Sequence, residues 1–325
     1  MEEKYYIGVD LGGTNIKAGM VTTKPKVIVK TSIPTEAEKG PEHVLDRIAD
    51  AAENVRKRSG LSRDLIGGIG VGSPGTLDIA AGVVLFPPNL TGWRNVPLVE
   101  HVAKKCGMQT VLENDANAAA YGEYWAGAAK GAESVVMFTL GTGIGGGIIV
   151  NGLLVHGNTD SAGELGHIVI EVDGRECPCG NRGCLERYAS ANAVAARFAE
   201  AVKRGEESML ADKVKAGEPL DAKTIEDAAL AGDELSNKIY WETGTYLGIG
   251  IVNILHTLNP ARVVLGGGLV GAGELLMRPV RETVEKRAIP DTQRNCVICL
   301  ATLGEDAGLI GAAGCALAAF GTSQS

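Results

Sequence analysis

Three cysteines and one histidine lie within one short segment and could bind a metal ion: His167, Cys177, Cys179 and Cys184. Three thiolates and one imidazole form the Cys3His set that is typical of structural zinc. The residues around the cysteines are polar and rich in turn formers, which disfavours the alternative of unpaired thiols in an apolar core. Because four protein ligands close a tetrahedral site, we expect the zinc to brace the fold and not to activate a water molecule.

Two other segments, residues 10–17 and 140–147, place glycine and threonine between two short apolar runs. A strand-forming run follows the glycines in both, so each segment predicts a hairpin turn. A third glycine turn follows the apolar run 262–265. Backbone N–H groups in such turns can hold anionic oxygens, so the three turns together favour a bound nucleotide. The residues that we assign to nucleotide binding are Asp10, Gly12, Gly13, Thr14, Asn15, Lys17, Thr142, Gly143, Gly266, Gly267 and Gly268.

Neither hairpin fits the common nucleotide-binding patterns. No glycine is followed by Lys and then Ser or Thr, as the P-loop requires. The second hairpin also lacks the helix that opens after a dinucleotide-binding turn, because the strand former Ile148 follows its glycines. In the first hairpin, Asp10 is suited to orient Mg²⁺ through water.

A candidate catalytic carboxylate stands where the strand-like run 110–112 meets an alanine-rich helix predicted over 116–127. The N-terminus of a helix stabilises an ionised carboxylate, so Asp115 is suited to accept a hydroxyl proton. The alternative is that Asn114 or Asp115 is a plain helix cap.

Two more carboxylates, Glu164 and Glu186, lie beside the metal ligands in the sequence. Their desolvation is costly unless they accept hydrogen bonds, which the hydroxyl groups of a sugar would donate. A pair of hydrolytic acids is the alternative, but it leaves both glycine hairpins unexplained.

Strands and helices alternate along the chain, which predicts an α/β fold. The repeat of a strand–glycine–strand unit suggests two related halves. Helices are also predicted at 41–59, 96–106, 192–204, 234–258 and 308–320, and a polar helical region at 213–230.

The composition limits the classes of partner. The formal net charge is −8 and the isoelectric point is about 5.3, so nucleic acid is not expected as a partner. No run of residues is apolar enough to span a membrane, and the first residues lack an apolar signal region, so we expect a cytoplasmic protein. Seven cysteines, three of them crowded together, are better explained in a reducing compartment by a metal than by disulfides.

These motifs resemble those of the ROK family of sugar kinases and repressors, within the actin-like ATPase superfold. The resemblance covers essentially the whole chain. It rests on Asp10-Leu-Gly-Gly-Thr14, Glu113-Asn114-Asp115-Ala-Asn117, Leu140-Gly-Thr-Gly-Ile-Gly-Gly-Gly147, Glu164-Leu-Gly-His167 and the cysteine segment 177–186. It implies a two-lobed actin-like ATPase (ribonuclease H-like) fold with mixed sheets flanked by helices and a cleft between the lobes. The expected lobes are 1–115 with 307–325, and 116–306 carrying the zinc knuckle.

The resemblance also implies roles for single residues. Asp115 would be the general base for the 6-hydroxyl of a hexose, with ATP as donor and Mg²⁺ accompanying the nucleotide. The residues implied to hold the sugar are Asn89, Asn114, Asp115, Glu164, His167 and Glu186. His167 would bind zinc through one ring nitrogen and sugar through the other. The family resemblance suggests a homodimer or a homotetramer.

The segment Pro88-Asn89-Leu90-x-Gly92-Trp93 is similar to the glucokinase branch, so glucose is the expected substrate. Mannose, fructose, allose and N-acetylmannosamine remain alternatives, as do ADP and polyphosphate as donors. A sugar-responsive repressor is a further alternative. It is disfavoured because such repressors carry a helix-turn-helix segment before the first hairpin, which here begins at residue 10.

Overall fold

The computed structural model describes residues 4–87, 90 and 92–321 of the chain. These form two compact units, Met1–Val135 with Gly147–Gly163 and Thr302–Ser325, and Val136–Gly146 with Glu164–Ala301. The first unit thus includes residues 116–135, 147–163 and 302–306, which the sequence analysis assigned to the larger lobe. The reason is that the helix beginning at Asp115 packs against the last helix of the chain.

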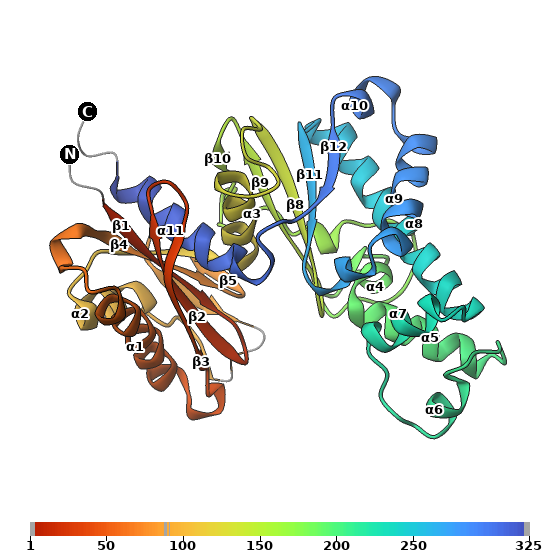
Figure 1. The fold of residues 1–325 in the computed structure, drawn as a ribbon. Helices are drawn as coiled ribbons and strands as arrows, with labels where there is room; N and C mark the ends of the chain where they lie inside the picture. Colours follow the sequence, from red (N-terminus) through yellow and green to blue (C-terminus); the bar gives the residue numbers. More distant parts are fainter. Residues whose placement is uncertain (1–3, 88–89, 91, 322–325) are drawn as a thin grey trace. The chain divides into compact units, whose positions relative to one another are not determined.

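The first unit is built on a mixed sheet with the strand order β3-β2-β1-β4-β7 (Figure 1). Its strands are β1 (Tyr5–Leu11), β2 (Asn15–Thr22), β3 (Val27–Pro34), β4 (Ile66–Ser73) and β7 (Thr110–Asn114). The first three form antiparallel hairpins, whereas β1, β4 and β7 run parallel. A two-stranded ribbon of β5 (Thr76–Asp78) and β6 (Val83–Phe86) follows β4. The predicted first hairpin is confirmed.

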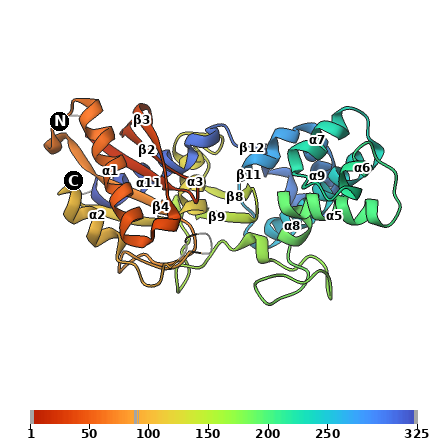
Figure 2. The same cartoon turned by 90° about the horizontal axis from the view of Figure 1, so that it is seen from below.

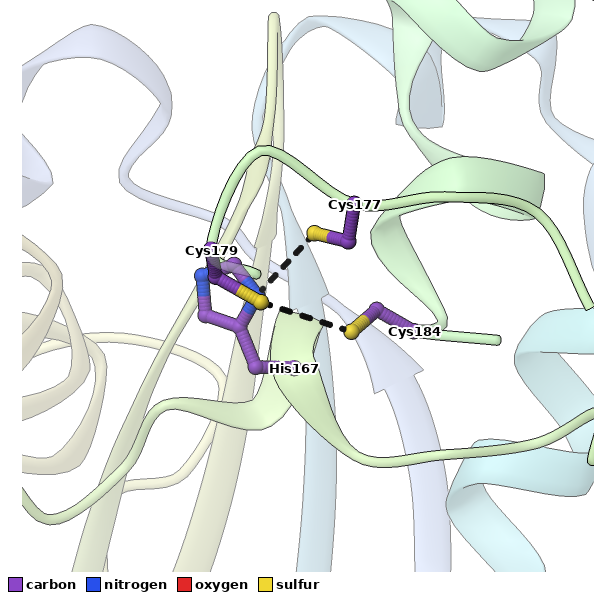
Figure 3. A group of neighbouring side chains, drawn as sticks. All are labelled: His167, Cys177, Cys179 and Cys184. Carbon is purple, nitrogen blue, oxygen red and sulfur yellow. Dashed lines mark hydrogen bonds between the residues drawn. The ribbon is translucent and has the colours of Figure 1, made fainter. Parts of the chain in front are cut away.

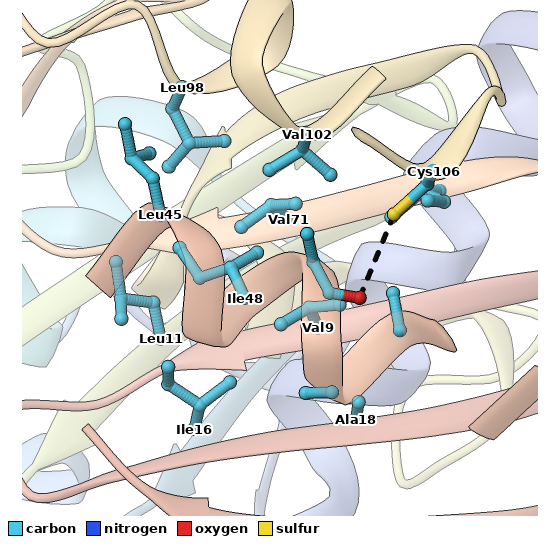
Figure 4. Close-up of a cluster of buried hydrophobic side chains, with 14 of the residues drawn as sticks. Val9, Leu11, Ile16, Ala18, Leu45, Ile48, Val71, Leu98, Val102 and Cys106 are labelled. Carbon is cyan, nitrogen blue, oxygen red and sulfur yellow. Dashed lines mark hydrogen bonds between the residues drawn. The ribbon is translucent and has the colours of Figure 1, made fainter. Parts of the chain in front are cut away.

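Helices cover both faces of this sheet, because side chains alternate between the faces along each strand. On one face, Val9 and Leu11 of β1 pack with residues of α1 (Pro41–Ser59) and α2 (Leu98–Cys106) in an apolar cluster (Figure 4). On the other face, Tyr6 packs with residues of α11 (Ala307–Phe320), and α11 in turn packs on α3 (Asp115–Trp125).

Glycines let α11 approach the sheet at backbone distance. A Cβ atom on Gly8 or Gly70 would collide with the carbonyl oxygen of Leu309 or Ala312. Asp10 follows Gly8 by two residues in β1, so both face the same side of the sheet. The carboxyl carbon of Asp10 would lie 2.8 Å from a Cβ atom added to Gly308. The sheet therefore places Asp10 beside the first turn of α11.

The second sheet has the order β10-β9-β8-β11-β12, and the division between the units falls within β8 and β9. Its strands are β8 (Ser134–Leu140), β9 (Ile144–Val150), β10 (Leu153–Leu154), β11 (Arg262–Gly266) and β12 (Val297–Leu300). The predicted second hairpin, between β8 and β9, is confirmed. Helices α5, α7, α8 and α9 pack on one another in the second unit (Figure 2). The helices of this unit are α4 (Glu186–Ala189), α5 (Ala191–Lys203), α6 (Ala211–Lys215), α7 (Ala222–Leu230), α8 (Glu234–Leu258), α9 (Glu274–Arg287) and α10 (Pro290–Arg294).

Short 3₁₀ helices complete the described chain: η1 (Ala37–Lys39), η2 (Arg63–Leu65), η3 (Leu165–His167), η4 (Gly268–Ala272) and η5 (Gly304–Asp306). The predicted polar helical region 213–230 contains parts of two helices, because α6 ends at Lys215 and α7 begins only after Asp221 caps it. The helix α9, which contains Pro279 and many charged residues, was not predicted from the sequence.

Candidate functional site

The carboxyl ends of three parallel strands bring the acidic residues of the first unit together. Asp10 on β1 pairs with Gly72 on β4, and Gly72 pairs with Glu113 on β7. The next residue pair, Ser73 and Asn114, ends both strands. Because the carboxyl ends of parallel strands meet at one edge, Asp10 and the junction between β7 and α3 share that edge.

The structure assigns the cap of α3 to Asn114. Its side-chain oxygen accepts hydrogen bonds from Ala116 N at 2.9 Å and Asn117 N at 3.2 Å. Asp115 is then the first residue of the helix, and its Oδ1 accepts from Ala116 N at 2.8 Å. The helix N-terminus thus stabilises the carboxylate of Asp115, as a general base at neutral pH requires.

Asp10 has a pKa raised from 3.8 to about 6. Burial is the main cause, the charge of Asp115 adds to it, and Lys17 opposes it. Lys17 also donates a hydrogen bond to Glu305 at 3.0 Å. The edge therefore holds two interacting carboxylates, an arrangement that a nearby cation would stabilise.

The first hairpin is held by one bond within its turn and by two bonds from Thr35, which directly follows β3. Gly12 N donates to Asn15 O at 3.0 Å, Thr35 N donates to Thr14 O at 2.8 Å, and Thr35 Oγ1 donates to Gly12 O at 2.7 Å. The N–H group of Gly12 is therefore used within the turn. Thr14 and Asn15 are exposed, as ligand-contacting residues must be.

The second hairpin is held by residues that follow it far along the chain. Gly141 N donates to Gly143 O at 3.0 Å, and Ala191 N donates to Gly141 O at 2.9 Å. Ile144 N donates to Glu186 Oε2 at 2.8 Å. A Cβ atom on Gly143 would lie 2.4 Å from the same carboxylate oxygen, so any larger residue there would displace the end of the Glu186 side chain. Glu186 thus links the start of α4 to the hairpin.

A pocket of about 280 Å³ in the second unit joins two of the predicted glycine turns. Gly141 and Thr142 line it from the second hairpin, and Gly268 lines it from the turn after β11. Its other lining residues were not predicted from the sequence; they come from α5, from α7 and its cap, from α8 and from η4: Ala191, Asp221, Ala222, Lys223, Glu226, Tyr240 and Leu269. They lie more than 40 residues beyond the second hairpin in the sequence, and no local motif marks them.

The four predicted metal ligands come together as expected from the cysteine pattern (Figure 3). Their ligand atoms all lie within 4.8 Å of one another. Cys179 Sγ lies 3.7 Å from Cys184 Sγ, and Cys177 Sγ lies 3.7 Å from His167 Nδ1. Tetrahedral zinc with Zn–S bonds of about 2.3 Å separates its ligand atoms by roughly 3.6–3.8 Å. The residues therefore fit zinc, with Nδ1 as the ligand nitrogen of His167.

The other ring nitrogen of His167 is directed to Glu164. His167 Nε2 lies 4.0 Å from Glu164 Oε2, and the side chain of Glu164 is 60% exposed. In the second unit, the predicted sugar ligands Glu164 and His167 are thus neighbours, and Glu186 follows the last cysteine by two residues. Asn89, the remaining predicted sugar ligand, lies outside the described residues.

One pair near the junction between β7 and α3, a buried glutamate and a half-buried histidine, was not predicted. Glu113 is 4% exposed and accepts a hydrogen bond from His156 Nε2 at 2.8 Å. A lone histidine and a strand glutamate 43 residues apart carry no sequence signal of pairing.

Across the described chain, no helix combines the length and hydrophobicity that a membrane span needs.

The chain also resembles known proteins over nearly its full length. A model of the ROK family matches residues 6–319. The glucokinase of Thermotoga maritima is 40% identical over 307 residues, which cover 94% of this chain and 95% of that protein. The glucokinase of Halalkalibacterium halodurans is 39% identical over 312 residues, which cover 96% of this chain and 94% of that protein.

Solved structures agree with this relationship. The crystal structure of a ROK family glucokinase from Streptomyces griseus, in complex with glucose and AMPPNP, is 35% identical with a TM-score of 0.78. The match covers 96% of this chain and 98% of that one. The predicted α/β fold of the actin-like ATPases is therefore confirmed, and the chain belongs to the ROK family.

Proposed function

We propose that this protein is an ATP-dependent glucokinase that phosphorylates the 6-hydroxyl of glucose. The observation that carries the proposal is the identity of 39–40% to two glucokinases over nearly the whole chain. The Streptomyces griseus structure with glucose and AMPPNP supports both the sugar and the ATP-type donor.

Asp115 is the general base in this proposal. Its carboxylate accepts the proton of the 6-hydroxyl while that oxygen forms a bond to the γ-phosphorus, and the bond from this phosphorus to the β–γ bridging oxygen breaks to release ADP. Mg²⁺, when bound with ATP, neutralises charge on the phosphate oxygens. Asp10 shares the sheet edge with Asp115 and would orient this ion through water.

Each proposed sugar ligand in the described chain keeps a polar group that can meet a hydroxyl. Because Asn114 Oδ1 caps α3, its amide nitrogen is the group left to donate to a hydroxyl. Glu186 uses Oε2 for Ile144 N, which leaves Oε1 to accept from the sugar. Glu164 supplies a further acceptor in the second unit, and His167 Nε2 keeps its N–H as a donor when Nδ1 binds zinc.

The nucleotide would be held by the three glycine turns. The pocket shared by Thr142 and Gly268 fits part of a nucleoside, and Gly13 and Thr14 would face phosphate oxygens. Zinc on the Cys3His cluster would fix the ring of His167 and the start of α4. We also propose a cytoplasmic homodimer or homotetramer, which analytical ultracentrifugation would distinguish.

The test of the base is Asp115→Asn. We expect kcat to fall by roughly 10²–10⁴, with a modest change in the KM for glucose, because the amide cannot accept the proton. The matched control is Asp50→Asn, an exposed aspartate on α1, which should keep wild-type kinetics. Near-normal turnover of Asp115→Asn would remove Asp115 from the role of base.

A coupled assay across hexoses and donors tests the substrate. Glucose with ATP should give the highest kcat/KM. A higher value with mannose, fructose, allose or N-acetylmannosamine, or with ADP or polyphosphate, would contradict the proposed specificity.

A further inference from the structure

Glu113 is a buried carboxylate at the end of β7, two residues before Asp115. Its Oε1 accepts hydrogen bonds from Asn114 N at 2.9 Å and from Asn117 Nδ2 at 3.0 Å. Asn117 is itself buried, in the first turn of α3. Glu113 therefore fastens β7 to α3 on both sides of Asp115, although its own side chain is too enclosed to meet a substrate.

The remaining oxygen of Glu113 reaches a different part of the first unit. His156 Nε2 lies 2.8 Å from Glu113 Oε2. His156 begins a turn in which its carbonyl accepts from Ala162 N at 3.0 Å, and Asp160 in the same turn accepts from Ile79 N at 2.8 Å. Segment 155–163 runs directly into Glu164, one of the proposed sugar ligands.

We propose that Glu113 and His156 are positioning residues that couple the β7–α3 junction, which carries Asp115, to segment 155–163, which leads into Glu164. The proposal rests on the proposed function, because its kinetic consequences concern sugar phosphorylation. Neither side chain is assigned a contact with a substrate. Their hydrogen bond holds the β7–α3 junction, with Asp115, and the start of segment 155–163 in a fixed relative position.

Electrostatics favours a charged pair. The hydrogen bond to Glu113 raises the pKa of His156 above its usual value, the charge of Asp160 adds to this, and burial opposes it. Cys315 of α11 also faces Glu113, but burial raises the pKa of its thiol well above the ordinary value, so it stays neutral. The imidazolium is therefore the group that neutralises the Glu113 carboxylate, and this contact weakens as the pH rises through the pKa of His156.

Two variants of His156 test the coupling. His156→Phe keeps a ring but removes the donor, and we expect kcat/KM for glucose to fall roughly tenfold, as losing a charge-assisted hydrogen bond implies. His156→Gln keeps a donor that does not titrate, so it should recover most of this activity. In the wild type, kcat/KM should decline as the pH rises through the His156 pKa, and this decline should be missing from the Gln variant.

Hydrogen exchange gives a readout that does not depend on the activity. Amides of 155–163 and 113–118 should exchange faster in His156→Phe than in the wild type, and those of 41–59 should not change. If the wild type fails to phosphorylate glucose, the proposed function is wrong, whereas the exchange result still decides whether the two segments are coupled.

His101→Gln is the matched control, because His101 Nε2 makes a similar 2.8 Å contact with Asp46 on the surface of the same unit. It should leave the kinetics, the pH profile and the exchange unchanged. The proposal is overturned if His156→Phe keeps the wild-type kcat/KM, pH profile and exchange. It is equally overturned if the Gln variant loses as much activity as the Phe variant and its pH profile matches that of the wild type.

Discussion

The two glycine hairpins have the same local sequence logic but are held in place differently. The first carries its own charged residues, Asp10 and Lys17, and bonds from Thr35 on the segment after β3 hold its turn. The second has no charged side chain between Leu140 and Gly147. It takes its carboxylate from Glu186 and a further backbone bond from Ala191.

This difference separates what each hairpin depends on. The first should depend on the sheet that contains it and on the ionisation of Asp10. The second should depend on α4, and hence on the cysteine knuckle that precedes α4 in the chain. The order of the first hairpin is therefore expected to be independent of the metal, and that of the second is not.

The largest expected effect comes from breaking the knuckle. Cys179→Ser should lose zinc and lower the melting temperature by roughly 10 °C or more, because structural zinc contributes folding energy. Amides of 141–144 should lose protection against hydrogen exchange, while those of 10–15 keep it. Zinc content, calorimetry and exchange mass spectrometry measure the three results.

Cys296→Ser is the control for this change, since Cys296 is partly buried and lies outside the cluster. It should retain zinc and the exchange pattern. Equal loss of protection at 10–15 and 141–144 in Cys179→Ser would contradict the separate support of the two hairpins, and well-folded wild-type protein without zinc would rule out the metal site.

A smaller effect is expected from crowding Glu186. Gly143→Ala places a methyl group against Glu186 Oε2, so the bond to Ile144 N must stretch or break. We expect kcat/KM for ATP to fall about tenfold, in line with the loss of a hydrogen bond to a charged group. The measurement is steady-state kinetics with ATP varied at saturating glucose.

Gly141→Ala is a matched variant, because a Cβ atom there meets nothing within 4 Å. It should cost less than Gly143→Ala. The reverse order would show that the close approach of Glu186 does not support the hairpin.

The sequence predicted those parts of the site whose signals are local. The cysteine knuckle could be predicted because three of its ligands fall within eight residues. Both hairpins could be predicted because strand-forming residues flank their glycines. The capping role of Asn114 or Asp115 stayed open, since both residue types favour that position and only the hydrogen bonds to Ala116 and Asn117 assign it.

Contacts between distant residues could not be predicted in this way. The hydrogen bond from Ile144 N to Glu186 joins residues 42 positions apart, and no local sequence pattern in either segment predicts it. The helix α9 was missed because Pro279 lies inside it and argues against a helix. The ring of Pro279 packs against Gly244 of α8, where a side chain would obstruct it. This packing depends on the tertiary structure and cannot be predicted from a local sequence pattern.

The last expected effect concerns the first hairpin and is confined to one interval of pH, where it changes stability. Asp10 has a folded pKa of about 6 and an ordinary value of 3.8, mainly because of burial and then because of Asp115. Between these pH values the unfolded chain has lost the proton while the folded chain keeps it. The folded state therefore binds more protons, and its stability falls as the pH rises from about 4 to about 6 and then levels.

Asp10→Asn removes this titration. As the pH rises from about 4 to about 6, the free energy of unfolding of the variant should therefore increase by about 1–3 kcal/mol relative to that of the wild type. Melting temperatures of both proteins from pH 4 to pH 8, without nucleotide or Mg²⁺, measure the difference, with Asp50→Asn as the exposed control. A difference that stays constant from pH 4 to pH 7 would show that the carboxyl of Asp10 ionises normally. The first hairpin would then carry an aspartate with an ordinary pKa. The two hairpins would differ only in which segments of the chain hold them in place.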